Sequence, residues 1–433
     1  MIEAPVTLIA AAALILGLFV SGIPIFLAFL LVNLLGVALL LGPQAFPMLI
    51  NSMFATTTNG QLTAIPLFVL MGEILFRSGA TELIFEAVDR FIGRVKGRQY
   101  VLAGILSAIF GALSGSNMAV AAMMARTIFP GMIARGYDRR LSMGMILGGA
   151  SLAPVIPPSV LVIIIATLAN VSVAGLLVAG VLPGLMLAAL FIGYAMLRIR
   201  LNPSLAPESA PSGRSLSVFR AILLCLPFFG LIALVLGLIL MGVATPSESA
   251  AMGVTGALVI AGLFGKLTLP LLKDALRAAA LMTAMILVIM ASSTLFSQLL
   301  AISGASRQIT ALVSSLDLSA GMMVLAMMVI VFAFCMFVDQ VAVMLIVIPI
   351  YLPVITLLGI DPLWFWMMML LNVTVGGITP PFGYAMFAFR GAARDVSMSE
   401  LFQASWAFVG LFIVGMLILA AFPSLATWLP GFV

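Results

Sequence analysis

The chain has 433 residues, of which 64% are hydrophobic and only 8% are charged, and its formal net charge is +5. A soluble domain carries about a quarter charged residues, so this composition excludes a water-soluble globular protein. Lys and Arg gather in the cytoplasmic loops of membrane proteins, and the basic excess therefore gives no reason to expect nucleic-acid binding. Histidine is absent, which removes imidazole metal sites and the commonest acid–base catalyst.

Apolar stretches recur from Val6 to the C-terminus. One membrane span needs roughly 20 apolar residues, so these stretches predict ten or more spanning segments in an all-α, multi-pass protein. The long hydrophilic connection over residues 197–217 carries several arginines and is expected to lie in the cytoplasm. It divides the chain into an N-terminal half, residues 1–196, and a C-terminal half, residues 218–433.

An internal repeat relates the two halves. A shift of 223 residues aligns residues 115–158 with residues 338–381 without a gap. The matches that are least expected by chance are Asp138 with Asp361, Pro157 with Pro380, and Pro158 with Pro381. Because secondary transporters often bind substrate where broken helices of two repeats meet, the repeat indicates where a site should lie.

In each half, a short polar segment separates two apolar stretches. This pattern predicts two re-entrant hairpins, each with a polar tip buried in protein. The alternative is an ordinary pair of spans in which small polar residues pack helices together. The hairpins are expected over residues 98–134 and 319–357, with tips at Ser114, Ser116 and Asn117 and at Asp339 and Gln340.

Adjacent prolines interrupt the apolar segment that follows each hairpin. Proline has no backbone N–H and disfavours helix at the preceding residue, so two in a row must unwind a span. The freed carbonyls can coordinate a cation, and the next half-helix begins with N–H groups suited to an anion. A proline kink without ligands is the alternative. Broken helices are predicted over about 141–169, with Pro157 and Pro158, and over about 361–392, with Pro380 and Pro381.

Four ionisable residues stand in apolar sequence: Glu73, Arg126, Glu248 and Asp339. A charge at the centre of a bilayer is costly, so such residues are candidates for function. Asp339 falls at a predicted tip and is the first choice for an ion or substrate role. For the other three, structural pairing and function both remain open.

At these motifs the sequence resembles the large membrane subunit of tripartite ATP-independent periplasmic (TRAP) transporters of the dicarboxylate and sialic acid group. The resemblance implies a fold of the ion transporter superfamily, with two inverted repeats, a scaffold, and a transport domain that moves like an elevator. It also implies a place in the bacterial inner membrane. The motifs that carry it are Ile65 to Phe68, Gly72-Glu73, Gly111 to Asn117, Gly148 to Ser159, Ala244 to Ala250 and Gly376 to Gly383.

The function that the resemblance implies is sodium-coupled uptake of a small organic anion, such as a C4-dicarboxylate or sialic acid, with no enzymatic activity. Sodium ions are the implied cofactor. The implied partners are a small four-helix membrane subunit and a periplasmic binding protein that delivers the substrate.

By the family pattern, each hairpin tip and the broken helix that follows it would hold one sodium ion, with substrate between the tips. The first sodium is assigned to Ser114, Ser116, Asn117, Gly149, Ala153 and Ile156. The second is assigned to Asp339, Asn372, Gly376 and Thr379. Substrate is assigned to Ser114, Ser116, Asn117, Asp339, Gln340, Pro157, Pro158, Pro380 and Pro381. Because Asp339-Gln340 stands where the first tip has Ser116-Asn117, the two halves are not chemically equivalent.

The nearest rival is a self-sufficient sodium-coupled dicarboxylate or citrate carrier, or an ion antiporter of the same superfamily. An intramembrane hydrolase with Ser114 or Ser116 as nucleophile would lack a histidine to activate it, and Lys266 and Lys273 lie at a loop. A passive channel would need a continuous polar stripe, which the sequence does not show.

Overall fold

The computed structural model describes residues 14, 17–18, 21–79, 81–92, 95–207, 217–316 and 318–433. The regular structure of these residues is helical, as the composition predicts. Before the linker the α-helices are α2 (Ile25–Gly36), α3 (Pro47–Thr57), α4 (Ala64–Arg77), α5 (Thr81–Ile92), α6 (Arg98–Ser114), α7 (Asn117–Thr127), α8 (Phe129–Ala134), α9 (Arg139–Ala150), α10 (Val160–Leu168), α11 (Val173–Ala179) and α12 (Val181–Leu201). After it they are α13 (Val218–Leu240), α14 (Pro246–Leu263), α15 (Leu269–Ile302), α16 (Ala305–Ser315), α17 (Ala320–Cys335), α18 (Gln340–Leu357), α19 (Pro362–Gly376), α20 (Tyr384–Ala392), α21 (Met398–Ala421) and α22 (Ser424–Thr427).

Five shorter helical segments complete the described structure. They are the π-helical η1 (Val37–Leu41) and the 3-10 helices η2 (Pro43–Ala45), η3 (Gly60–Thr63), η4 (Pro203–Leu205) and η5 (Leu429–Phe432).

Seven helical stretches of the described residues are long and apolar enough to cross a membrane. The remaining apolar helices are shorter, and they are Phe26–Leu39, Arg98–Ser114, Ala320–Cys335 and Pro362–Gly376. The expectation of ten or more spanning segments is therefore reached only if these short helices are included. Three of them end at the polar tips or at a broken helix, which composition alone does not distinguish from a complete span.

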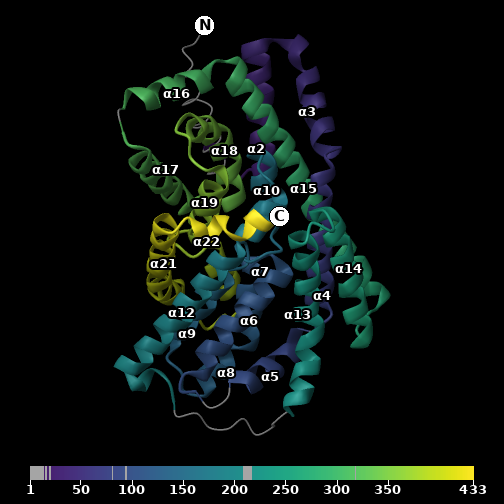
Figure 1. The fold of residues 1–433 in the computed structure, drawn as a ribbon, viewed down its shortest axis with the longest axis vertical. Coiled ribbons are helices and arrows are strands. Elements are labelled where there is room, and N and C mark those ends of the chain that lie inside the picture. The colour runs from purple at the N-terminus through teal and green to yellow at the C-terminus, as the bar shows by residue number, and fades with distance from the viewer. Residues whose placement is uncertain are drawn as a thin grey trace.

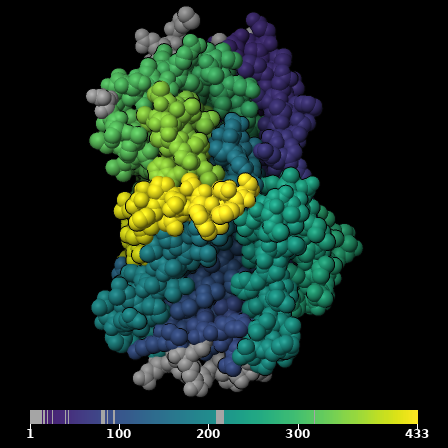
Figure 2. Space-filling view, in the orientation of Figure 1, coloured from purple at the N-terminus to yellow at the C-terminus, as the bar shows by residue number. Residues whose placement is uncertain are grey.

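The helices pack in two groups (Figure 1). In one group, the long α15 packs against α2, α3 and α4, while α14 packs against α4 and α13. In the other group, α6, α7, α12 and α21 surround α9, and α17 and α21 pack against α19. The C-terminal α22 and η5 contact α11 and run across the face of the molecule at mid-height (Figure 2).

The end of α12 and the start of α13, on either side of the linker, lie at one end of the molecule (Figure 1). α12 continues to Leu201, past the predicted start of the linker at 197, because Arg198 and Arg200 occupy its last turn, where cations favour the helix dipole. Residues 208–216 lie outside the described part. The hydroxyl of Tyr100 donates to the carbonyl of Leu205 at 2.8 Å, which places the start of α6 at this end.

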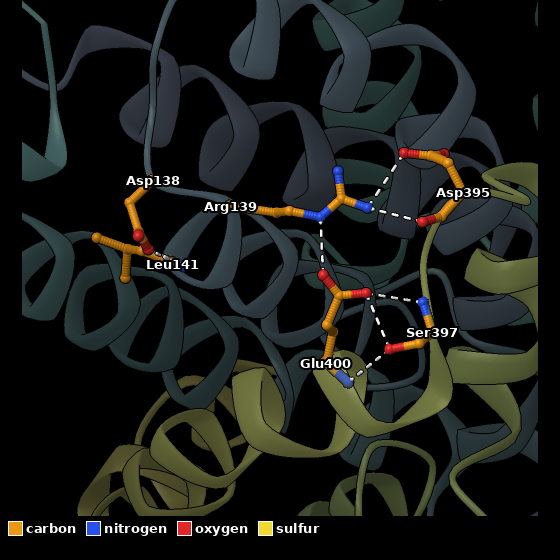
Figure 3. A network of polar contacts seen from close by, with 6 residues as sticks. All are labelled: Asp138, Arg139, Leu141, Asp395, Ser397 and Glu400. Atoms are coloured by element: carbon orange, nitrogen blue, oxygen red, sulfur yellow. Dashed lines mark hydrogen bonds and ion pairs between the residues drawn. The ribbon is translucent and has the colours of Figure 1, made fainter.

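An ion-pair network joins α9 to α21 at the same end (Figure 3). Arg139 Nε lies 2.9 Å from Glu400 Oε1, and Arg139 Nη2 lies 3.1 Å from Asp395 Oδ2. Glu400 also accepts the backbone N–H and the hydroxyl of Ser397, which caps α21. The network holds together two helices that are far apart in the sequence.

Candidate substrate and cation site

The first predicted tip is a tight turn between α6 and α7. Gly115 has a φ of +62°, a conformation that glycine adopts without a steric penalty. Ser116 caps α7 by accepting the backbone N–H of Ala119 at 3.3 Å. Ser114 Oγ accepts the backbone N–H of Ser116 at 3.3 Å. Both serine hydroxyl oxygens thus help to shape the turn.

Asn117 connects this tip to the other half of the chain. Its side chain is buried, and Nδ2 donates to the hydroxyl of Tyr384 at 2.9 Å. A Cβ at Gly377 would lie 2.6 Å from that hydroxyl and 3.0 Å from Asn117 Nδ2. Sequence reasoning did not identify Tyr384, although it is the hydroxyl-bearing residue in the first turn of the half-helix that follows the second proline pair.

The first proline pair does interrupt its helix. α9 ends at Ala150, and α10 begins at Val160 after a capping hydrogen bond from the Val162 N–H to Ser159 Oγ. Pro157 and Pro158, joined by a cis peptide bond, lie between these two helices. A continued helix would use an N–H at Pro157 to bond the carbonyl of Ala153, and proline has none. The Ala153 carbonyl is therefore free to bind something else.

This first break packs directly against α6. A Cβ at Gly111 would lie 2.9 Å from Ala153 Cα, and one at Gly115 would lie 3.8 Å from the Pro158 carbonyl oxygen. A Cβ at Gly149 would lie 2.7 Å from Ser107 Oγ, which is buried and has no hydrogen-bond partner among the described residues. The structure thus brings the first tip, Gly149 and Ala153 onto one side of α6.

Ile156 belongs to the first break. Its backbone N–H donates to the carbonyl of Leu152 at 2.9 Å, and its side chain packs against Gly184 of α12. Only its backbone carbonyl can serve as a ligand.

The second break has the same arrangement with different chemistry. α19 ends at Gly376 and α20 begins at Tyr384, with Pro380 and Pro381, also joined by a cis peptide bond, between them. A Cβ at Gly376 would lie 2.8 Å from the carbonyl oxygen of Cys335, at the end of α17. The Phe382 N–H donates to the carbonyl of Met336 at 3.2 Å. The break therefore packs against the helix that leads into the second tip.

Two predicted ligands near the second break already make structural hydrogen bonds. Thr379 Oγ1 donates to the Val375 carbonyl at 2.7 Å, and the Thr379 N–H donates to the Gly376 carbonyl at 3.1 Å. Asn372 Nδ2 donates to the Met328 carbonyl at 2.8 Å, which anchors α19 to α17. Both side chains retain acceptor oxygens, but their positions are fixed by these bonds.

The second tip is acidic. Asp339 caps α18 by accepting the Val341 N–H at 2.9 Å. No ion pair joins Asp339 to a cation in the described chain. Beside it, the buried Oε1 of Gln340 has no hydrogen-bond donor among the described residues. The tip thus presents acceptor oxygens, which suit a cation.

The other ionisable candidates do not belong to this site. Glu73 pairs with Arg77 at 2.6 Å on α4. Glu248 has a structural role. It lies exposed in the first turn of α14 and accepts the N–H of Thr245 at 2.8 Å in a capping box, which lowers its pKa. Arg126 is exposed near the end of α7.

Two described cavities separate the end of α10 from α14 and α15. A cavity of about 880 Å³ is lined by Asn59, Thr167, Asn170 and Thr245, among others, and a smaller one of about 260 Å³ shares the first three residues. Thr167 ends the half-helix that begins at the first break. The two cavities therefore lie at the C-terminal end of α10, which is the end away from the first break.

The arrangement defines a class of protein. Two helices are broken at prolines, each break packs against a polar tip, and α7 packs against α20 while α18 packs against α10. Unwound backbone of this kind is tolerated at membrane depth only where it lines a cavity or is buried in protein, and it typifies secondary transporters.

Comparison with known proteins identifies the family. Residues 11–425 match the family model described as the tripartite ATP-independent periplasmic transporter, DctM component, and the chain belongs to this family. It is therefore a large permease subunit, in the bacterial inner membrane, of a transporter that also needs a small membrane subunit and a periplasmic binding protein. Its relatives are transport components and not enzymes.

Curated relatives span almost the whole chain. The ectoine TRAP transporter large permease protein TeaC of Halomonas elongata is 27% identical over 96% of this chain and 97% of its own length. The C4-dicarboxylate TRAP transporter large permease protein DctM of Pseudomonas aeruginosa is 28% identical over 91% of each chain. The crystal structure of the YdaH transporter of Alcanivorax borkumensis has a similar fold, with a TM-score of 0.64, 15% identity and 90% coverage of both chains.

Proposed function

We propose that this chain carries a small organic anion inward together with sodium ions, after a periplasmic binding protein has delivered the substrate. The substrate class is a carboxylate such as a C4-dicarboxylate or a sialic acid. Among the similar large permease subunits, several are named for ectoine or C4-dicarboxylates, both of which carry carboxylates. The small membrane partner is expected to have four helices.

The observation that carries this proposal is the pairing of each proline break with a hairpin tip. At the first break, the Ala153 carbonyl loses its helical donor directly beside α6. Four half-helices, α7, α10, α18 and α20, begin around the tips and breaks. Their N-terminal N–H groups favour an anion, while the freed carbonyls favour a cation.

The residues present fit sodium. Hard cations prefer oxygen ligands, and both positions have unpartnered oxygens: Ser107 Oγ at the first and Gln340 Oε1 at the second. The first position offers neutral hydroxyl, amide and carbonyl oxygens from Ser114, Ser116 and Asn117 and from the break. The second adds the carboxylate of Asp339. Sodium at these positions would hold each tip against the neighbouring break and complete a pocket for the substrate.

Coupling to sodium supplies a driving force of known size. Moving one elementary charge through 100 mV is worth about 2.3 kcal/mol. Two sodium ions with a monoanion carry one net charge and would gain about that amount from the membrane potential alone. The transport step would be an elevator movement of one group of helices relative to the other. The polar cavities between α10 and the helices α14 and α15 support such a movement.

The test is uptake into proteoliposomes that contain this chain, its small membrane partner and the binding protein. We expect uptake to require external sodium and, for a monoanionic substrate such as a sialic acid, to accelerate with an inside-negative potential. Equal accumulation with sodium or choline outside would overturn the proposal. A self-sufficient sodium-coupled carrier is the alternative, and uptake at the full rate without the binding protein would favour it.

A further inference from the structure

A cleft of about 620 Å³ lies at the far end of the helix pair formed by α7 and α20. Asn117 and Tyr384, at the N-terminal ends of these helices, are hydrogen-bonded at the candidate site. The C-terminal ends border the cleft, which includes Arg126 from α7 and Arg394 just after α20. α7 rises about 1.5 Å per residue, so the cleft lies roughly 15 Å from the tip. One pair of packed helices therefore connects the two places.

The cleft presents two arginines that make no direct ion pair. Arg126 and Arg394 are both exposed, and neither has a hydrogen bond or ion pair within the described chain. The acid at the rim, Asp395, bonds Arg139, which also bonds Glu400 (Figure 3). The guanidinium groups of Arg126 and Arg394 thus remain available, and their geometry matches a carboxylate well.

Apolar residues line the cleft beside these charges. Pro130 and Ile133 lie in the lining, and behind them the buried Phe129 packs edge-to-face on Phe389 at 5.2 Å between ring centroids. An apolar wall lowers the local dielectric and strengthens the attraction between a guanidinium and an anion. The lining suits a small organic anion, with an apolar part against Pro130 and Ile133 and a carboxylate at the arginines.

We propose that this cleft is a second anion site, which receives the substrate carboxylate after it leaves the tips. The inference rests on the proposed function, because it assumes that an anion moves along α7 and α20. Arg139 at its edge follows Asp138, whose N–H donates to the Leu205 carbonyl at 3.1 Å, so the cleft lies toward the linker end of the molecule. The positive-inside rule makes that end cytoplasmic, where substrate is released.

An anionic lipid headgroup has the same chemistry as a carboxylate and must be distinguished from it. The experiment uses the full chain with its small membrane partner in nanodiscs. Phenylglyoxal, which modifies free arginines, is applied, and the rate at each arginine is followed by peptide mass spectrometry. Succinate is the soluble probe, in nanodiscs of phosphatidylcholine alone. Phosphatidylglycerol, without succinate, is the lipid probe. Arg390 is the matched control, because it is exposed on the same helix, α20, and does not line the cleft.

We expect succinate to slow the modification of Arg126 and Arg394 several-fold and to leave Arg390 unchanged. In R126Q, the succinate concentration that half-protects Arg394 should rise about tenfold. In R394Q, the concentration that half-protects Arg126 should rise by the same factor. Each variant loses one charge-assisted contact with the carboxylate. R390Q should leave both values unchanged. Exposed substitutions of this kind alter stability little, and thermal unfolding of each variant verifies that it is folded.

Equal modification rates with and without succinate would overturn the proposal. Protection by phosphatidylglycerol but not by succinate would also overturn it, in favour of a lipid site. Failure of the proposed function would appear separately, as sodium-independent uptake in the proteoliposome assay. In that case protection by succinate would still establish an anion site in the cleft.

Discussion

Removing the hydroxyl of Tyr384 should weaken the candidate site without disturbing the rest of the fold. Tyr384→Phe leaves the buried Asn117 Nδ2 without its partner at 2.9 Å. A buried donor that loses its partner costs about 1–3 kcal/mol. If that cost falls on the bound state, the apparent affinity for substrate and sodium falls by roughly ten- to a hundredfold.

The assay is initial uptake into proteoliposomes with all three components, titrated with sodium and then with substrate. Tyr351→Phe is the matched control, since it also removes a tyrosine hydroxyl bond, to the Met327 carbonyl at 3.2 Å, but within the second hairpin. We expect the control to lower thermal stability and leave the affinities unchanged.

A double-mutant cycle makes the test strict. Asn117→Ala combined with Tyr384→Phe should be no worse than the more damaging single change, because both remove the same bond. Additive losses, or an affinity in Tyr384→Phe equal to that of the unaltered protein, would refute the reasoning.

Two further changes follow from the packing and the caps. Gly111→Ala would place a Cβ 2.9 Å from Ala153 Cα, and such overpacking costs about 1–3 kcal/mol. We expect uptake by this variant to depend more weakly on the external sodium concentration. Gly131→Ala is the control, because a Cβ there would have nothing within 4 Å, and it should behave as the unaltered protein. Glu248→Ala should lower the unfolding temperature by removing the capping box of α14. The pKa of Glu248 is depressed by Thr245, so this stabilisation is present above the ordinary value of 4.5 and is lost as the pH falls through the folded-state pKa. The pH dependence of unfolding should therefore be shallower in acid for the variant, and an unchanged profile would argue against the capping role.

The features that the sequence predicted well depend on neighbouring residues. Proline lacks an N–H wherever it stands, so the interruptions around Pro157 and Pro380 follow from local chemistry. Capping by Ser116 and Asp339 was not predicted, although it is also local, because each side chain bonds an N–H two or three residues away. The all-helical class followed from composition alone.

The features that the sequence could not predict depend on contacts between distant residues. The bond from the amide nitrogen of Asn372 to the Met328 carbonyl in α17 is revealed only by the packing of α19. Glu248 stands in apolar sequence, which left its role open, and the structure places it exposed in the first turn of α14 with a capping role. Tyr384 was missed because its partner Asn117 is 267 residues away in sequence.

These distant contacts also join the two halves at the candidate site. The tip of the first hairpin bonds Tyr384 in the second half, and α7 lies along α20. The second hairpin contributes α18, which packs against α10 from the first half. Each broken helix is thus held from one side by the hairpin of its own half and from the other by the hairpin of the opposite half. A shift of either tip must therefore move oxygens at both breaks, so the proposed cation positions and the substrate position between them would change together.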